Sequence, residues 1–208
     1  MNMKALFCTF FIAVLATELA RGQGTLIFDQ QSSTNSEQAA GGAIIQQIAT
    51  PYGQSFTPSL SAIQFIQLAF FDFNDGNGSG ATVFVNLRSG AVNGAILAQT
   101  ASVFMPDGFG RTGLNAAVTN FFFSEAIAVT PGDTYYFQPV VQSGDSWGLS
   151  AGEYMYPGGN TFAGGNPLPG SDYWFREGIF AVPEPSATWM FLVGLGLVLL
   201  RLRRQRVT

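Results

Sequence analysis

Residues 130–141 read Thr130-Pro131-Gly132-Asp133-Thr134-Tyr135-Tyr136-Phe137-Gln138-Pro139-Val140-Val141, a turn followed by a strand. Proline at the second position and glycine at the third suit a type II turn, because proline restricts φ and glycine accepts a positive φ. The residues after the turn are rich in aromatic and β-branched side chains, which favour a pleated sheet. A turn leading into such a strand is typical of an antiparallel β-protein.

The same signals recur along the rest of the chain. Val83, Val85 and Leu87 alternate with more polar neighbours, which is the two-residue period of a strand. Aromatic residues make up 14% of the chain, so a β core is favoured over a helical one. A helix is conceivable only over residues 36–47, where Gly41-Gly42 argues against it. Further strands are predicted at 25–29, 54–56, 63–73, 95–104, 120–129 and 174–181. The pattern predicts an all-β fold, an antiparallel β-sandwich of the jelly-roll kind, over residues 23–181.

The N-terminus has the parts of a secretory signal peptide. Residues 1–4 form a short basic region, residues 5–16 form an apolar region, and Ala20-Arg21-Gly22 offers small residues at the −3 and −1 positions. We expect signal peptidase to cleave after Gly22, so that residues 1–22 are removed. A signal anchor that stays attached is the alternative.

The C-terminal residues 182–208 join an extended motif to an apolar run and a basic end. The motif is Val182-Pro183-Glu184-Pro185-Ser186, whose prolines keep the backbone extended and accessible to an enzyme. The apolar run predicts a transmembrane helix over residues 187–202, near the lower length limit for crossing a bilayer. The basic end is Arg201, Arg203, Arg204 and Arg206. These arginines predict a cytoplasmic C-terminus and a body on the opposite side of the membrane.

Together these parts resemble the PEP-CTERM sorting signal of Gram-negative bacteria. The resemblance implies recognition by an exosortase, a membrane protein regarded as a cysteine transpeptidase that removes the tail near the Pro-Glu-Pro motif. Membrane attachment would then be transient, and the body would reach the cell surface or an extracellular matrix. The resemblance also implies a producer of exopolysaccharide and thus a biofilm setting. An ordinary single-pass anchor after a proline linker is the alternative.

The body also resembles, less specifically, a jelly-roll-like module of exported bacterial proteins. The likeness implies a sandwich of lectin-like shape and transfers no functional residue. The segments that carry it are Gly53-Gln54-Ser55-Phe56-Thr57-Pro58, residues 130–137, Trp147-Gly148 and Tyr156-Pro157-Gly158-Gly159.

Charge and composition exclude several classes of function. Residues 23–181 contain three arginines, no lysine and eleven acidic residues, for a net charge of −8, so nucleic-acid binding is disfavoured. The same residues contain no cysteine, so no disulfide can stabilise the body. The whole chain has no histidine, which removes Ser-His-Asp, Cys-His and His-metal sites at once. We therefore expect no cofactor, no metal and no enzymatic activity.

Two kinds of acidic site stay open as alternatives. Paired carboxylates could hydrolyse a glycoside, although nothing in the sequence pairs any two of them across a sugar. The candidates are Asp29, Glu37, Asp72, Asp75, Asp107, Glu125, Asp133, Asp145, Glu153, Asp172 and Glu177. Residues 72–78 superficially resemble a calcium loop, but Gly76 and Asn77 occupy its fifth and sixth positions, so the EF-hand interpretation fails. Some other oxygen-ligand calcium site in the loops remains an alternative.

One segment of the body, residues 145–174, has the composition of a saccharide site. It joins aromatic rings, which stack on the apolar faces of sugars, to polar side chains that bond hydroxyl groups, on glycine-rich loops. The candidates are Trp147, Tyr154, Tyr156, Tyr173, Trp174, Asp145 and Asp172. The alternative is that these rings only fill the ends of the sandwich. Exposure of Trp147, Tyr156 and Trp174 separates the two interpretations.

Three functions follow from the sequence. The first is a non-enzymatic surface or matrix protein associated with exopolysaccharide, which needs only the two terminal signals and a stable β body. The second is a glycan-binding, lectin-like module. The third, a carboxylate-dependent glycoside hydrolase, has the least support.

Overall fold

The computed structural model describes residues 24–34, 42–45, 51–110, 116–152 and 154–181. Residues Ile27–Ile179 form one compact unit. The second unit comprises Met1–Leu26 and Phe180–Thr208, of which residues 24–26 and 180–181 are described. The predicted signal peptide, the sorting motif, the helix over 187–202 and the terminal arginines all lie outside the described residues.

The described residues form two antiparallel sheets, which confirms the predicted all-β class. Sheet A has the order β1-β14-β4-β10-β13, with β2 paired to β10 and β8 paired to β4. Its strands are β1 (Thr25–Gln31), β2 (Gly42–Ile45), β4 (Ala62–Asp72), β8 (Ala117–Ala128), β10 (Trp147–Gly152), β13 (Asp172–Tyr173) and β14 (Phe175–Ala181). Sheet B has the order β12-β11-β3-β9-β5-β6, with β7 paired to β5. Its strands are β3 (Gly53–Phe56), β5 (Ala81–Ser89), β6 (Ala95–Gln99), β7 (Val103–Met105), β9 (Tyr135–Gly144), β11 (Thr161–Ala163) and β12 (Asn166–Leu168).

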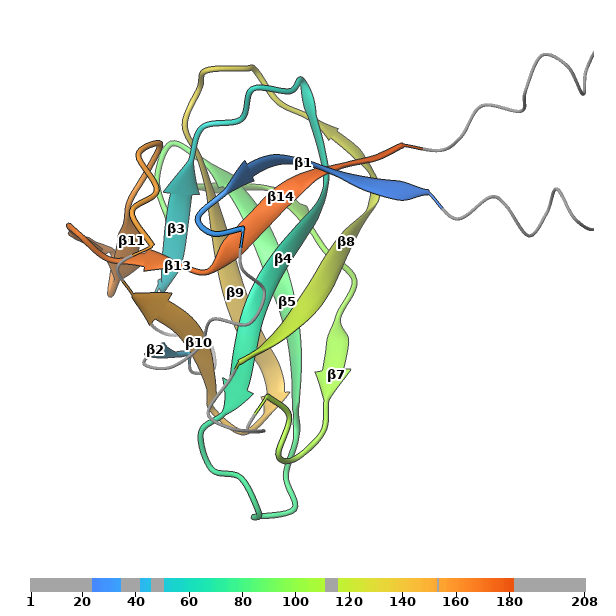
Figure 1. The fold of residues 1–208 in the computed structure, drawn as a ribbon, viewed down its shortest axis with the longest axis vertical. Coiled ribbons are helices and arrows are strands. Elements are labelled where there is room, and N and C mark those ends of the chain that lie inside the picture. The colour runs from blue at the N-terminus through green and yellow to red at the C-terminus, as the bar shows by residue number, and fades with distance from the viewer. Residues whose placement is uncertain (1–23, 35–41, 46–50, 111–115, 153, 182–208) are drawn as a thin grey trace, which may run out of the picture. The chain divides into compact units, whose positions relative to one another are not determined.

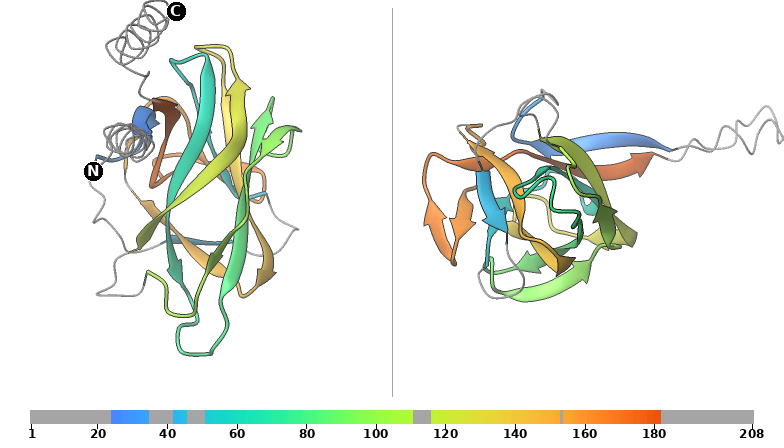
Figure 2. Two further views of the ribbon diagram at one scale, coloured as in Figure 1. Left: turned by 90° about the vertical axis from the view of Figure 1, so that its right-hand side faces the viewer. Right: turned by 90° about the horizontal axis from the view of Figure 1, so that it is seen from below.

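The two sheets share one hydrophobic core in a sandwich-like arrangement. Figure 1 shows β14, β4 and β8 in front of β9 and β5, and Figure 2 shows the sheets from two other directions. Phe56 of β3, Phe137 of β9 and Phe175 of β14 meet between the sheets, with ring centroids 5.1–6.3 Å apart. Burying each such side chain stabilises the fold by roughly 1.5–3 kcal/mol.

The predicted period and turn are both found in sheet B. Val83, Val85 and Leu87 of β5 are completely buried. In the turn before β9, Gly132 has a φ of 85°, and the Asp133 N–H donates to the Thr130 carbonyl at 3.1 Å. This is the geometry of a type II turn, because its third residue requires a positive φ.

Two segments differ from the prediction. The strand expected over 95–104 is divided into β6 and β7, because Thr100 Oγ1 accepts the Val85 N–H at 2.9 Å and the Ala101 N–H turns to the Phe122 carbonyl at 3.0 Å. The segment expected to form loops, 145–174, contains β10 and three short strands. β10 pairs with β4 of sheet A, and its Trp147 and Leu149 side chains point into the core.

Within the part of the chain that the structure describes, there is no helix of the length and apolarity needed to cross a membrane. Part of the stretch considered for a helix, residues 42–45, is β2. The rest of that stretch lies outside the described residues.

Candidate functional site

The aromatic rings predicted to hold a sugar are mostly buried. Trp147, Tyr173 and Trp174 have no exposed surface, and Tyr156 is 7% exposed. Trp147 packs in the core against Phe109, with ring centroids 5.8 Å apart. Rings that are covered by protein cannot stack on a sugar, so a platform built on Trp147, Tyr156 and Trp174 is contradicted. Trp147, Tyr156 and Tyr173 belong to the main core, and sequence composition alone did not reveal the direction of these side chains.

Tyr156 and Asp172 belong to a buried polar network that joins the two sheets. Asp172 accepts hydrogen bonds from Gln54 Nε2 at 2.8 Å and from the Tyr156 N–H at 2.7 Å. Gln54 Oε1 accepts from Thr161 Oγ1 at 2.7 Å and from the Tyr173 N–H at 3.0 Å. Each side chain at the centre of this network is satisfied by protein groups, as buried polar groups must be. The network therefore supports the fold, and Asp172 is not directed at solvent.

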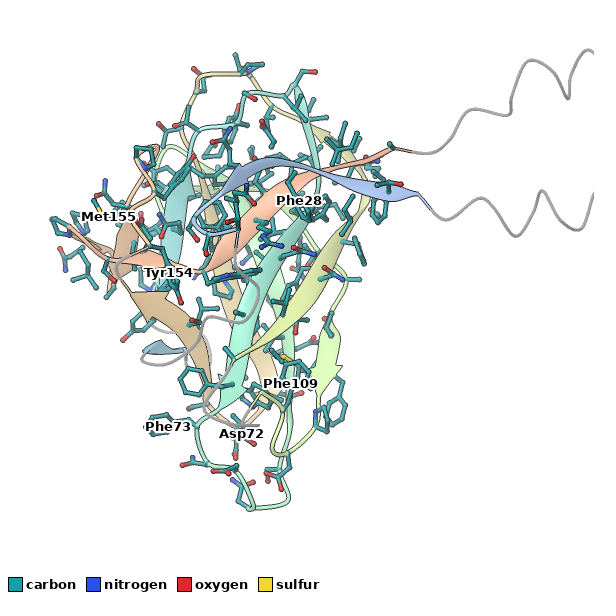
Figure 3. The ribbon with its side chains drawn as sticks, in the orientation of Figure 1. Phe28, Asp72, Phe73, Phe109, Tyr154 and Met155 are labelled. Atoms are coloured by element: carbon teal, nitrogen blue, oxygen red, sulfur yellow. The ribbon has the colours of Figure 1, made fainter. Side chains whose placement is uncertain are left out.

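Trp174 lies on the outer face of sheet A, under other side chains. It forms a small cluster with Ala69 and Ala116, and the half-buried Tyr154 packs against that cluster. The Tyr154 hydroxyl shares a hydrogen bond of 2.7 Å with Ser150 Oγ. The Arg176 guanidinium lies over the Trp174 ring, 4.8 Å from its centroid. Tyr154 and its neighbour Met155 are labelled in Figure 3.

Asp145 lies in a different part of the unit, where acidic side chains close loops. Asp145 accepts a hydrogen bond from Asn77 Nδ2. Asp72 accepts from the Asn74 N–H at 2.8 Å and the Gly108 N–H at 2.9 Å, and Figure 3 marks its place at the end of β4. Asp107 accepts from Gly76 and Gly78, and the Gly78 N–H in particular lowers the pKa of its carboxyl.

The loop acids therefore bond backbone and side-chain amide N–H groups, mostly of neighbouring loops. No set of three or more acidic, cysteine or histidine side chains in the described ranges is arranged to hold a metal ion.

Asp29 and Glu177 are two acids whose side chains lie near each other. Burial alone would raise the pKa of Asp29, but hydrogen bonds from Ser59 and from the Leu60 N–H outweigh it, and the pKa is lowered. Glu177 is fully buried, and neither carboxyl oxygen has a hydrogen-bond partner among the described residues. Burial, with the negative charge of Asp29 nearby, raises the pKa of Glu177 to about 9. A substrate cannot reach a fully buried acid, so this pair does not form a glycosidase site.

A second group of aromatic and polar side chains lies on the outer face of sheet A, where the sequence predicted no site. Phe28 of β1 and Phe122 of β8 are 40% and 38% exposed. In the row beside them, Gln67 of β4 lies opposite Asn120 of β8 and Arg176 of β14. The alternation within residues 63–73 could have placed Phe65 and Gln67 on one face, but only the strand order brings the other residues beside them.

The described residues at the two ends of the body lie side by side. Strand β1 begins at Thr25, three residues after Gly22, where cleavage is predicted, and it pairs with β14. Strand β14 ends at Ala181, directly before Val182 of the sorting motif. Within the second unit, Gly24 approaches Phe180 so closely that a Cβ at Gly24 would lie 3.0 Å from Phe180 Cδ1.

Comparison with known proteins identifies the C-terminal segment. Residues 181–206 match the PEP-CTERM protein-sorting motif. This match confirms the resemblance drawn from Pro183, Glu184, Pro185 and the terminal arginines, and it indicates an exported protein that is sorted by an exosortase. No curated protein matches the chain.

Proposed function

We propose that this protein is a non-enzymatic component of the cell surface or extracellular matrix, delivered by exosortase and associated with exopolysaccharide. The observation that carries the proposal is the PEP-CTERM motif over residues 181–206, because it specifies a route of export and processing. Signal peptidase removes residues 1–22, and exosortase removes the tail near Pro183-Glu184-Pro185. Membrane attachment through residues 187–202 lasts until that step.

The described body supports a structural role over a catalytic one. The side chains of Gln54 and Asp172 form hydrogen bonds with other groups of the protein. Glu177 is buried, so a substrate cannot reach it. The body is a jelly-roll-like sandwich whose acidic surface, with a net charge of −8, keeps it soluble after release from the membrane.

The proposal is tested by replacing Pro183, Glu184 and Pro185 with alanines in the producing organism. Intact-mass measurement of the exported protein should show a wild-type chain truncated near residue 183 and a variant that is uncut and stays in the membrane fraction. The chain offers a matched control in Pro167-Leu168-Pro169, an exposed Pro-x-Pro triplet of the body, whose replacement with alanines should leave processing unchanged. A mature wild-type protein that still ends at Thr208 would exclude the sorting proposal.

A further inference from the structure

Three neighbouring strands arrange the outer face of sheet A into rows across the sheet. In one row, Arg176 of β14 lies opposite Gln67 of β4, which lies opposite Asn120 of β8. In the next row, Phe65 of β4 lies opposite Phe122 of β8. Phe28, on the far side of β14, completes this aromatic row, because its ring contacts Phe65. A polar row thus runs beside an aromatic one.

The aromatic row is rigid and partly open to solvent. Phe65 is fully buried, and it makes edge contacts with both exposed rings, at 5.7 Å from Phe28 and 6.5 Å from Phe122. The Arg176 guanidinium lies 5.2 Å from the Phe28 centroid and donates from Nε to the Ser33 carbonyl at 3.1 Å. The two exposed rings are therefore held in place by protein contacts, and a ligand that stacks on them pays little ordering entropy.

The polar row offers hydrogen-bonding capacity that the described residues do not use. Gln67 is 93% buried, and its Nε2 donates to Asn120 Oδ1 at 2.7 Å. Its Oε1 is buried and has no hydrogen-bond partner among the described residues. An unpaired buried amide oxygen costs free energy, which a donor from a ligand would recover. Asn120 is exposed, so its side-chain amide can be reached from solvent beside the buried Gln67.

A pyranose has the matching chemistry, because it presents an apolar face of C–H groups and a rim of hydroxyl groups. The C–H face suits the exposed phenylalanine rings, and the hydroxyl groups suit the Gln67–Asn120 amides. The net charge of the body determines whether a neutral or a charged polysaccharide can bind. A net charge of −8 repels a polyanion, so the ligand should be neutral.

We infer that the outer face of sheet A, at Phe28, Gln67, Asn120, Phe122 and Arg176, binds a neutral polysaccharide of flat, β-linked pyranoses. The inference deepens the proposed association with exopolysaccharide and rests on it. Because β-linked chains are extended, the sugar rings pass along the aromatic row with their hydroxyl groups over the amide row. The protein would then bind the matrix through this face.

The test is affinity gel electrophoresis of the full chain, kept soluble in a detergent without a sugar headgroup. Gels contain hydroxyethyl cellulose as the neutral probe or alginate as the acidic one. We expect hydroxyethyl cellulose to retard the wild-type chain and alginate to leave it unaffected. Phe122→Ala and Asn120→Ala should each weaken the apparent affinity about tenfold, which corresponds to about 1.4 kcal/mol.

Phe104 provides the matched control. It is more exposed than either proposed ring, at 66%, but lies on β7 of sheet B. Phe104→Ala should therefore bind like the wild type, and near-UV circular dichroism should show that every variant is folded. Lack of retardation by hydroxyethyl cellulose would overturn the inference, as would equal losses in Phe104→Ala and Phe122→Ala, or retardation by alginate alone.

Failure of this inference and failure of the proposed function give different results. A chain whose tail is processed but which hydroxyethyl cellulose does not retard retains its sorting route and lacks this site. A chain that is retarded but still ends at Thr208 has the site and lacks the sorting route.

Discussion

The aromatic rings on the two faces of sheet A differ in their exposure to solvent. On the inner face, Trp147 and Phe175 are fully buried between the sheets. On the outer face, Phe28 and Phe122 keep more than a third of their surface exposed around the buried Phe65. Both faces carry aromatic rings. The difference shows that the direction of a side chain, more than its type, decides whether a ring stabilises the fold or is available to a ligand.

The polar side chains on the two faces also differ, in whether their buried atoms have hydrogen-bond partners. Asp172 and Gln54 satisfy each other inside the unit, whereas the Gln67–Asn120 pair leaves one oxygen without a partner on the outer face. Glu177 is the exception on the inner side, because its carboxyl is buried with no hydrogen-bond partner among the described residues. Variants on each face can test this division, in order of decreasing effect on stability.

The largest loss should follow from Trp147→Ala on the inner face. Removing a fully buried indole leaves a cavity, and such changes cost about 3–5 kcal/mol of the free energy of unfolding. Urea denaturation followed by circular dichroism measures this loss. Phe104→Ala, at an exposed position, should change the same quantity by less than about 0.5 kcal/mol. Similar losses in the two variants would show that Trp147 does not lie in the core.

Glu177 should make stability depend on pH. Its pKa is raised to about 9 in the folded state, mainly by burial, from an ordinary value of 4.5. The folded state therefore holds a proton that the unfolded state has lost between these two values. Stability from this group is fully present below pH 4.5 and falls as pH rises toward 9, by up to about 1.4 kcal/mol per pH unit.

Glu177→Gln tests this dependence, because glutamine resembles the protonated acid and cannot ionise. At pH 8 the variant should exceed the wild type by on the order of 2 kcal/mol in the free energy of unfolding. At pH 5 the two should nearly coincide. Both are compared by urea denaturation above pH 4.5, where Asp29, with its lowered pKa, stays ionised. Parallel pH profiles for the two chains would contradict the burial of Glu177.

Phe122→Ala should cost less than the core variant, since Phe122 is 38% exposed and only part of its surface is lost from contact. We expect a loss of about 1 kcal/mol from the free energy of unfolding, mostly through its edge contact with Phe65. A loss as large as that of Trp147→Ala would place Phe122 in the core and remove it from the proposed binding face.

The smallest effect should be a gain in stability from Met155→Gly. Met155 is 82% exposed and has a φ of 53°, a left-handed conformation that is strained for a residue with a side chain. Glycine adopts it freely, so thermal denaturation should show a gain of about 0.5–1 kcal/mol. Met155→Val, which is β-branched, should instead destabilise the chain. A loss in the glycine variant would mean that the Met155 side chain makes a contact that matters for stability.

The strands were predictable where the two-residue period was strong. Residues 81–89 and 135–144 form strands near the predicted positions. In both strands, alternating apolar side chains bury one face of the sheet, so the local pattern was sufficient to predict them. Strand β10 was missed because Gly148, Ser150 and Gly152 resemble loop residues. Gly148 is needed there for packing, since the Phe71 ring lies against it and a Cβ would lie 2.1 Å from Phe71 Cζ.

The sequence by itself determined the β class and the sorting signal, since both depend on local features: side-chain alternation, turn residues, and the order of motif, apolar run and arginines. Tertiary structure decided which aromatic residues are available. Strand order places Phe28, Gln67 and Phe122 on one open face, although they are far apart in the chain. It also turns Trp147 and Tyr156 into the core. Burial is a property of packed neighbours, and no local pattern specifies neighbours that are distant in sequence.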